Sequence, residues 1–200
     1  GFPIDMGSSG ESSPILVDLD EDGVLEVLIG TADGLVNAFY GDGTMVDGWP
    51  VYADDSGRLH LESAAFTGGE VEPTTGDSFT ATVAAADIDG DGDVEVVGAS
   101  HWGGVYAWHA DGSRVDGFPV FSIGREPDEF GRDYKYDQGF TGAPTLRDID
   151  GDAVAEIVLA GLDGRLYILD GTGAHVGPSP FDMCFPGSPE LDLEDALCGV

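Results

Sequence analysis

The chain has 200 residues, and its 39 Asp and Glu residues far outnumber its 7 Lys and Arg residues, leaving a formal net charge of −32. Such a surface repels nucleic acid and anionic membranes, so neither is expected as a partner. A hydrophobic fraction of 42% is that of a globular domain rather than a disordered chain. No apolar run is long enough to predict a membrane span.

The chain opens with Gly1-Phe2-Pro3-Ile4, and the same kind of sequence recurs at Gly48-Trp49-Pro50-Val51 and Gly117-Phe118-Pro119-Val120. The start without methionine is typical of a processed or excised chain. The match predicts that residues 1–4 are the last strand of a repeat whose other strands are absent. We expect the aromatic-proline pairs to pack between neighbouring repeats.

Three repeat units follow, each about 40 residues long: residues 12–51, 81–120 and 142–180. Each unit predicts a short apolar strand, an acidic loop, a second strand such as 26–29, a turn, a third strand such as 35–40, a turn, and a fourth short strand around Trp49-Pro50-Val51. Short strands between Gly and Asp turns are typical of antiparallel β-structure, and nothing has helical period.

The acidic loop of each unit reads Asp-x-Asp-x-Asp-x-x-x-Glu. Its carboxylates are Asp18, Asp20, Asp22 and Glu26, then Asp87, Asp89, Asp91 and Glu95, then Asp148, Asp150, Asp152 and Glu156. Backbone carbonyl ligands are predicted from Val24, Val94 and Val154. Four carboxylates so close together repel one another unless a hard cation lies among them, and calcium takes six to eight oxygen ligands. The pattern predicts about three calcium ions, one per unit, which would bring the charge to about −26. The alternative is an acidic surface turn without metal.

The sixth position of the loop is Gly23 in the first unit and Gly92 in the second, which permits a sharp bend. The third unit has Ala153 there. A residue with a Cβ costs more at positive φ, so the third site is expected to be weaker or differently shaped.

Two predicted insertions, residues 52–80 and 121–141, separate the units, and a tail follows at 181–200. The turn after the second strand of the second unit is expected near the 121–141 insertion. A candidate ligand face then consists of His101, Trp102, Arg132, Tyr134, Lys135 and Tyr136. Aromatic rings beside basic groups stack on a sugar or bind an acidic partner. Packing of Trp102 against a neighbouring repeat is the alternative.

The tail contains both cysteines, Cys184 and Cys198. A pair that closes a short terminal loop is typical of a disulfide in an oxidising compartment. Two unrelated thiols, or a metal pair without partners, are the alternatives.

The repeated core Asp-(Leu/Ile)-Asp-x-Asp-x-x-x-Glu, with its flanking strands, resembles the FG-GAP/VCBS-type repeats of integrin α-subunit propellers and of many secreted microbial proteins. The resemblance covers residues 12–51, 81–120 and 142–180, with residues 1–4 as a partial match. It implies an all-β propeller with calcium in the loop between the first two strands of each blade. The expected fold is three four-stranded antiparallel blades plus an N-terminal strand from a further blade.

Propellers close with about four to eight blades, so three blades form an incomplete ring. Three arrangements remain open: a piece of a longer propeller, a closed ring of two copies, or a head-to-tail filament. We expect a secreted or cell-surface module, stabilised by calcium, that acts in adhesion, scaffolding or self-assembly with a protein or glycan ligand. The alternative is a propeller module of a polysaccharide-acting extracellular enzyme. No catalytic constellation is found in the sequence, so no enzyme activity is predicted.

Overall fold

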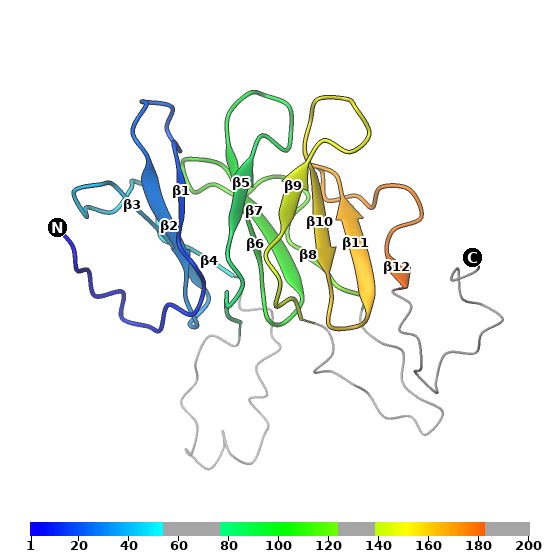
Figure 1. Ribbon diagram of the computed structural model, residues 1–200, viewed down its shortest axis with the longest axis horizontal. Coiled ribbons are helices and arrows are strands. Elements are labelled where there is room, and N and C mark those ends of the chain that lie inside the picture. Colours follow the sequence, from blue (N-terminus) through cyan, green and yellow to red (C-terminus); the bar gives the residue numbers. More distant parts are fainter. Residues whose placement is uncertain (54–76, 124–138, 183–200) are drawn as a thin grey trace, which may run out of the picture.

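The computed structural model describes residues 1–53, 77–123 and 139–182, which form three separate four-stranded antiparallel sheets (Figure 1). Blade 1 consists of β1 (Ile15–Val17), β2 (Glu26–Gly30), β3 (Leu35–Phe39) and β4 (Val51–Tyr52). Blade 2 consists of β5 (Ala84–Ala86), β6 (Glu95–Ala99), β7 (Gly104–Trp108) and β8 (Val120–Phe121). Blade 3 consists of β9 (Thr145–Arg147), β10 (Glu156–Ala160), β11 (Arg165–Leu169) and β12 (Phe181–Asp182).

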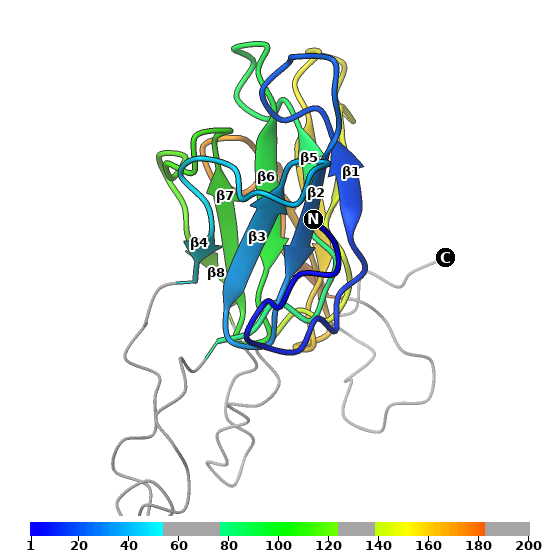
Figure 2. The same ribbon diagram turned by 90° about the vertical axis from the view of Figure 1, so that its left-hand side faces the viewer.

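Within each blade the strands lie in chain order, and the three blades stand in a row that does not close (Figures 1 and 2). The described residues contain no helix, and hence none long and apolar enough to cross a membrane. The predicted all-β fold of three four-stranded antiparallel blades is confirmed. The central strands β2, β6 and β10 are rich in branched residues because both faces of each blade are available for packing.

The core lies between the blades. Between blades 1 and 2, Leu28, Val36 and Ala38 contact Val96, Tyr106 and Trp108. Between blades 2 and 3, Val97, Ala99, Val105 and Ala107 contact Ile157, Leu159, Tyr167 and Leu169. Blade 2 therefore turns one face of its central strands towards blade 1 and the other towards blade 3.

The aromatic-proline segments join neighbouring blades, as predicted. Trp49 is buried, and its Nε1 donates a hydrogen bond of 2.9 Å to the carbonyl of Ala110 in blade 2. A Cβ on Gly48 would lie 2.0 Å from the carbonyl oxygen of Asp111, so this close approach requires glycine. The fourth strand predicted around Trp49-Pro50-Val51 is present as β4 but begins only at Val51, because Trp49 packs across to the next blade.

Residues 1–4 form no strand, yet Gly1 lies against blade 1 at the place that Gly48 takes against blade 2. A Cβ on Gly1 would lie 3.6 Å from the carbonyl of Asp42, the residue equivalent to Asp111. The N-terminal segment thus occupies the position of a preceding blade's linking segment.

The unit boundaries extend beyond the prediction. The fourth strands β4, β8 and β12 end at Tyr52, Phe121 and Asp182, within the predicted insertions and tail. The backbone N–H of Phe79 donates to Thr31 O of blade 1 at 3.1 Å, and that of Phe140 donates to Ser100 O of blade 2 at 3.0 Å. The ends of both predicted insertions therefore hydrogen-bond to the blade that precedes them.

Candidate metal centres

The three acidic loops lie together on one rim of the blades, the acidic rim, where they join β1 to β2, β5 to β6 and β9 to β10 (Figure 1). In each loop, three side chains offer ligand atoms within 4.8 Å of one another. These sets are Asp18, Asp20 and Asp22; Asp87, Asp89 and Asp91; and Asp148, Asp150 and Glu156. The fold therefore brings together carboxylates that the repeat pattern selected in all three units.

The loops share one backbone path. Positions four and six have positive φ in every copy, including two residues that carry a Cβ, Glu21 at 59° and Ala153 at 76°. The sixth residue donates its N–H to the first aspartate in each loop, from Gly23 to Asp18 at 3.0 Å and from Ala153 to Asp148 at 3.0 Å. The bend predicted at position six is confirmed, and Ala153 adopts it in the left-handed region that costs a non-glycine residue free energy.

The closing glutamates are buried at the start of the second strand. Glu26 is 1%, Glu95 0% and Glu156 4% exposed. Each accepts a hydrogen bond from the second residue of its own loop: Leu19 N to Glu26 at 2.9 Å, Ile88 N to Glu95 at 3.0 Å, and Ile149 N to Glu156 at 2.8 Å. These bonds use one oxygen of each carboxylate and leave the other for a further partner.

The first loop contains carboxylate oxygens that the protein does not satisfy. Asp18 Oδ1 and Glu26 Oε1 are buried and have no hydrogen-bond partner among the described residues. Burial raises the pKa of Glu26, and the negative charges of Asp20, Asp22 and Asp18 raise it further. Buried polar atoms are nearly always paired, so orphaned oxygens among like charges fit a hard cation. The residues present therefore meet the requirements of a calcium site.

In the second loop, the residue predicted to offer a backbone carbonyl ligand, Val94, is one residue past the equivalent position in the other two loops. The seventh residue is recognised by its N–H, which donates to the fifth-position aspartate: Val24 to Asp22 at 2.7 Å and Val154 to Asp152 at 2.9 Å. In the second loop the corresponding donor is Asp93, which bonds to Asp91 at 2.9 Å. Asp93, not Val94, is therefore the residue equivalent to Val24 and Val154.

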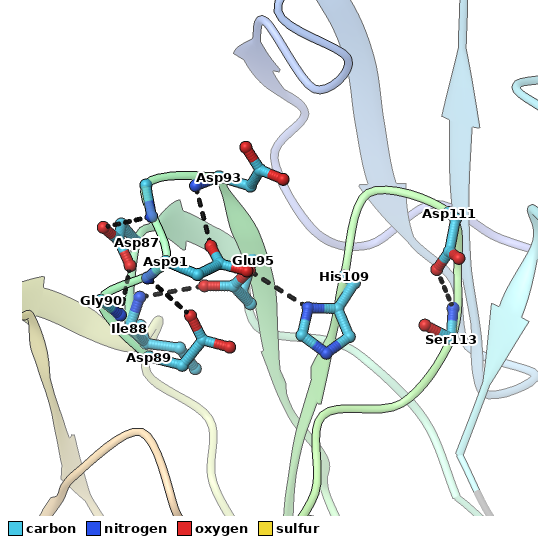
Figure 3. A network of polar contacts seen from close by, with 11 residues as sticks. Asp87, Ile88, Asp89, Gly90, Asp91, Asp93, Glu95, His109, Asp111 and Ser113 are labelled. Carbon is cyan, nitrogen blue, oxygen red and sulfur yellow. Dashed lines mark hydrogen bonds and ion pairs between the residues drawn. The ribbon is translucent and has the colours of Figure 1, made fainter.

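The second loop has a neighbour that the sequence analysis did not assign to it. His109 follows β7, and its Nδ1 lies 3.3 Å from Glu95 Oε1 (Figure 3). Asp89, Glu95 and His109 form a further set with ligand atoms within 4.8 Å of one another. Burial raises the pKa of Glu95, and the charges of Asp89 and Asp91 raise it further. Aligning the third strands shows that His109 stands where Tyr40 and Asp170 stand, but only the pairing of β6 with β7 shows that it meets Glu95.

The opposite rim carries the turns between the second and third strands, including His101 and Trp102. Ser122 N donates to Gly103 O at 2.8 Å, so this turn lies beside the start of the predicted 121–141 insertion, as expected. His101 is exposed, and the Trp102 side chain is partly buried. The remaining residues of the predicted ligand face, Arg132, Tyr134, Lys135 and Tyr136, lie outside the described residues, as do Cys184 and Cys198.

The sequence analysis missed two buried acids on this rim. Asp77 accepts hydrogen bonds from Ser78 N at 2.9 Å, Trp102 N at 3.1 Å and Tyr106 OH at 3.4 Å. Asp163 accepts one from Tyr167 OH, which in turn accepts one from Ile123 N at 3.0 Å. Asp163 follows the turn pattern of Asp33, whereas Asp77 comes from the predicted first insertion and no spacing identifies it.

No protein-family model matches the chain, and no curated protein matches it. Among solved structures it is similar to BamB from Moraxella catarrhalis, with 17% identity and a TM-score of 0.50 over 87% of this chain and 38% of that one. It is also similar to BBS1N in complex with ARL6DN, with 12% identity and a TM-score of 0.40 over 85% of this chain and 57% of that one. The chain spans less than two thirds of either structure. The likeness to BamB, together with the three blades, defines the class of protein: an open β-propeller segment.

Proposed function

We propose that this chain is a calcium-stabilised propeller module of the FG-GAP/VCBS type, in which each acidic loop binds one calcium ion. The observation that carries the proposal is the pair of buried, unpartnered oxygens in the first loop, Asp18 Oδ1 and Glu26 Oε1. A cation supplies the positive charge that the first loop lacks, since residues 18–26 contain no Lys or Arg.

The ion would be coordinated by side chains from both the loop and the strand that follows it. Asp18, Asp20 and Asp22 would supply carboxylate oxygens from the bend. Glu26 would add its Oε1 from the start of β2. The bond from Leu19 N holds the Glu26 carboxylate in place. Because the ligands come from a loop and a strand, binding stabilises the folded blade over the unfolded chain.

The open ends of the row support a role in assembly. Val158, Leu166 and Ile168 on blade 3 are partly exposed, whereas their equivalents on blade 1, Leu28, Val36 and Ala38, are fully buried under blade 2. On blade 1, Val27 and Ile29 are likewise partly exposed. Apolar faces of this kind are covered by a further blade in a propeller. The proposed module is therefore completed by more blades, from the same polypeptide or a second copy.

A secreted or cell-surface setting suits both the proposed calcium sites and the large negative charge. Extracellular modules bind calcium at about 10⁻⁴–10⁻³ M, concentrations found outside the cell. Salt and calcium also screen a net charge of −32. In that setting the proposed role is adhesion or scaffolding.

Calcium titration by calorimetry tests the metal sites. The isosteric variant Glu26→Gln removes one ligand charge, and Glu21→Gln removes the same charge from an exposed side chain in the same loop. We expect one fewer calcium ion for Glu26→Gln and unchanged stoichiometry for Glu21→Gln. A chain that binds no calcium, or two variants that behave alike, would contradict the proposal.

Sedimentation in calcium tests assembly. We expect the chain to associate with rising concentration and Ile168→Asp, on the open face of blade 3, to prevent it. Ile123→Asp places the same charge at an exposed position outside the β-strands and serves as the control. A wild-type chain that stays monomeric at all concentrations would contradict self-assembly.

A further inference from the structure

We propose that the second acidic loop is a mixed nitrogen and oxygen site for a first-row transition metal, with zinc as its reference ion, held by Asp89, Glu95 and His109. The inference rests on the proposed function, since it assumes that the loop binds a cation, and it assigns this loop a different class of ion from loops 1 and 3.

The three side chains converge from three parts of blade 2. Asp89 belongs to the acidic loop and Glu95 begins β6, whereas His109 follows β7 and points its ring towards both carboxylates (Figure 3). One ligand atom from each lies within 4.8 Å of the others. The set is therefore more than an acidic turn, because an imidazole from outside the loop completes it.

The separation of His109 Nδ1 and Glu95 Oε1 is long for a charge-assisted hydrogen bond and is also compatible with two ligands of one metal ion. It is 3.3 Å, whereas charge-assisted hydrogen bonds are about 2.7–2.9 Å long. Two atoms that each lie about 2.0–2.1 Å from a tetrahedral zinc ion are about 3.3 Å apart. The nitrogen and the oxygen thus already have the separation that two zinc ligands need.

The carboxylate of Glu95 is also poised to accept a cation. It is fully buried, and its Oε2 is occupied by Ile88 N, so the described residues give Oε1 the imidazole as its partner. The equivalent atom in the first loop, Glu26 Oε1, is buried and has no partner in the described part of the chain. The fold therefore directs this glutamate oxygen into the loop in both blades.

The same backbone position holds a different side chain in each blade. His109 N donates to Ser113 O, just as Tyr40 N donates to Thr44 O and Asp170 N donates to Ala174 O, each at 2.9 Å. These turns fix the position identically, but the side chain is a phenol in blade 1 and a carboxylate in blade 3. Blade 2 therefore differs from the other two by a nitrogen ligand.

The nitrogen changes which ion the loop prefers. Calcium and magnesium take oxygen ligands, whereas imidazole suits zinc, copper, iron and nickel. Loops 1 and 3 offer oxygen alone and suit calcium, while loop 2 offers two carboxylates and an imidazole. A calcium-loaded chain is therefore expected to exchange one ion for zinc.

Calorimetric titration with zinc and with calcium, at fixed pH, tests the inference on three proteins: wild type, His109→Tyr and Tyr40→His. His109→Tyr installs the residue that blade 1 carries at the same backbone position. We expect wild type to bind one zinc ion tightly even in excess calcium. In His109→Tyr, zinc affinity should fall by at least about 10–100-fold, since losing a ligand costs no less than losing an outer-shell partner. Tyr40→His should gain zinc affinity at loop 1.

A spectroscopic arm identifies the nitrogen ligand. Cobalt substituted for zinc should give a visible absorption spectrum in wild type that His109→Tyr loses. Unchanged zinc affinity and an unchanged cobalt spectrum in His109→Tyr, or no gain in Tyr40→His, would overturn the inference. If calcium still binds while zinc shows no preference, the mixed site fails and the calcium module stands. If neither ion binds, the proposed function itself fails.

Discussion

Asp77 on one rim and Glu26 on the acidic rim are both buried carboxylates, yet they differ in their hydrogen-bond partners and in the charges around them. Asp77 receives two backbone N–H groups and a tyrosine hydroxyl. Glu26 receives one N–H, keeps an oxygen without a partner, and faces Asp18, Asp20 and Asp22. Burial raises the pKa of both acids, but hydrogen bonds oppose the rise at Asp77, whereas like charges add to it at Glu26. Protein groups satisfy Asp77, whereas the proposed calcium ion would supply the partner that Glu26 Oε1 lacks among the described residues.

The largest expected effect is on the stability of the Glu26→Gln variant, which should change in opposite directions in calcium and in chelator. In saturating calcium it should lose stability, because an ion present at about 100 times its Kd contributes about 2.7 kcal/mol. In chelator it should gain stability, because the amide removes a charge that the aspartates repel. Thermal unfolding in both buffers measures the two effects, with Glu21→Gln as the control. If the variant's stability changed in the same direction in both buffers, Glu26 would not differ from Asp77 in its need for a cation.

On the opposite rim, Asp77→Ala should destabilise by about 1–3 kcal/mol, because it leaves buried donors unpaired. The cost should be equal in calcium and in chelator, since Asp77 lies far from the acidic loops in the blade. Urea denaturation in both buffers gives this comparison. A cost that appears in one buffer alone would link Asp77 to the metal sites.

The pH dependence of stability should also reverse with calcium. In chelator, Glu26 and Glu95 have folded-state pKa values above their ordinary value of 4.5, so the folded state binds protons more readily than the unfolded state. Their protonation stabilises the fold at low pH, and this stability is lost as pH rises through the raised pKa values. In calcium, protons compete with the ion, so stability should fall with decreasing pH. Melting curves between pH 5 and 7 test both slopes, and parallel slopes would contradict the account.

The smallest expected effect is at Ala153. Replacing it with glycine at φ 76° should stabilise the chain by about 1 kcal/mol, because the left-handed conformation no longer carries a Cβ penalty. Gly92→Ala makes the reverse change in the second loop and should destabilise by a similar amount. Chemical denaturation of both variants checks this, and equal stability of all three proteins would show that the loop tolerates the Cβ.

The sequence predicted those features that depend on local repetition. The strand pattern, the acidic loops and the sharp bend at position six recur in register, so alignment of the units was enough to find them. Asp77 was missed because its partners, Trp102 in the turn between β6 and β7 and Tyr106 in β7, have no spacing that links them to it. His109 was missed because its role depends on pairing between β6 and β7, which brings it to Glu95. Contacts that arise from sheet pairing and not from the repeat need the fold to be known.

Scanning calorimetry of the wild-type chain, in a series of calcium concentrations and in excess chelator, tests the central claim most directly. The account predicts that the melting temperature rises with calcium concentration and is lowest in chelator, because the ion binds the folded acidic loops and not the unfolded chain. A melting temperature that is the same in chelator and in saturating calcium would contradict it.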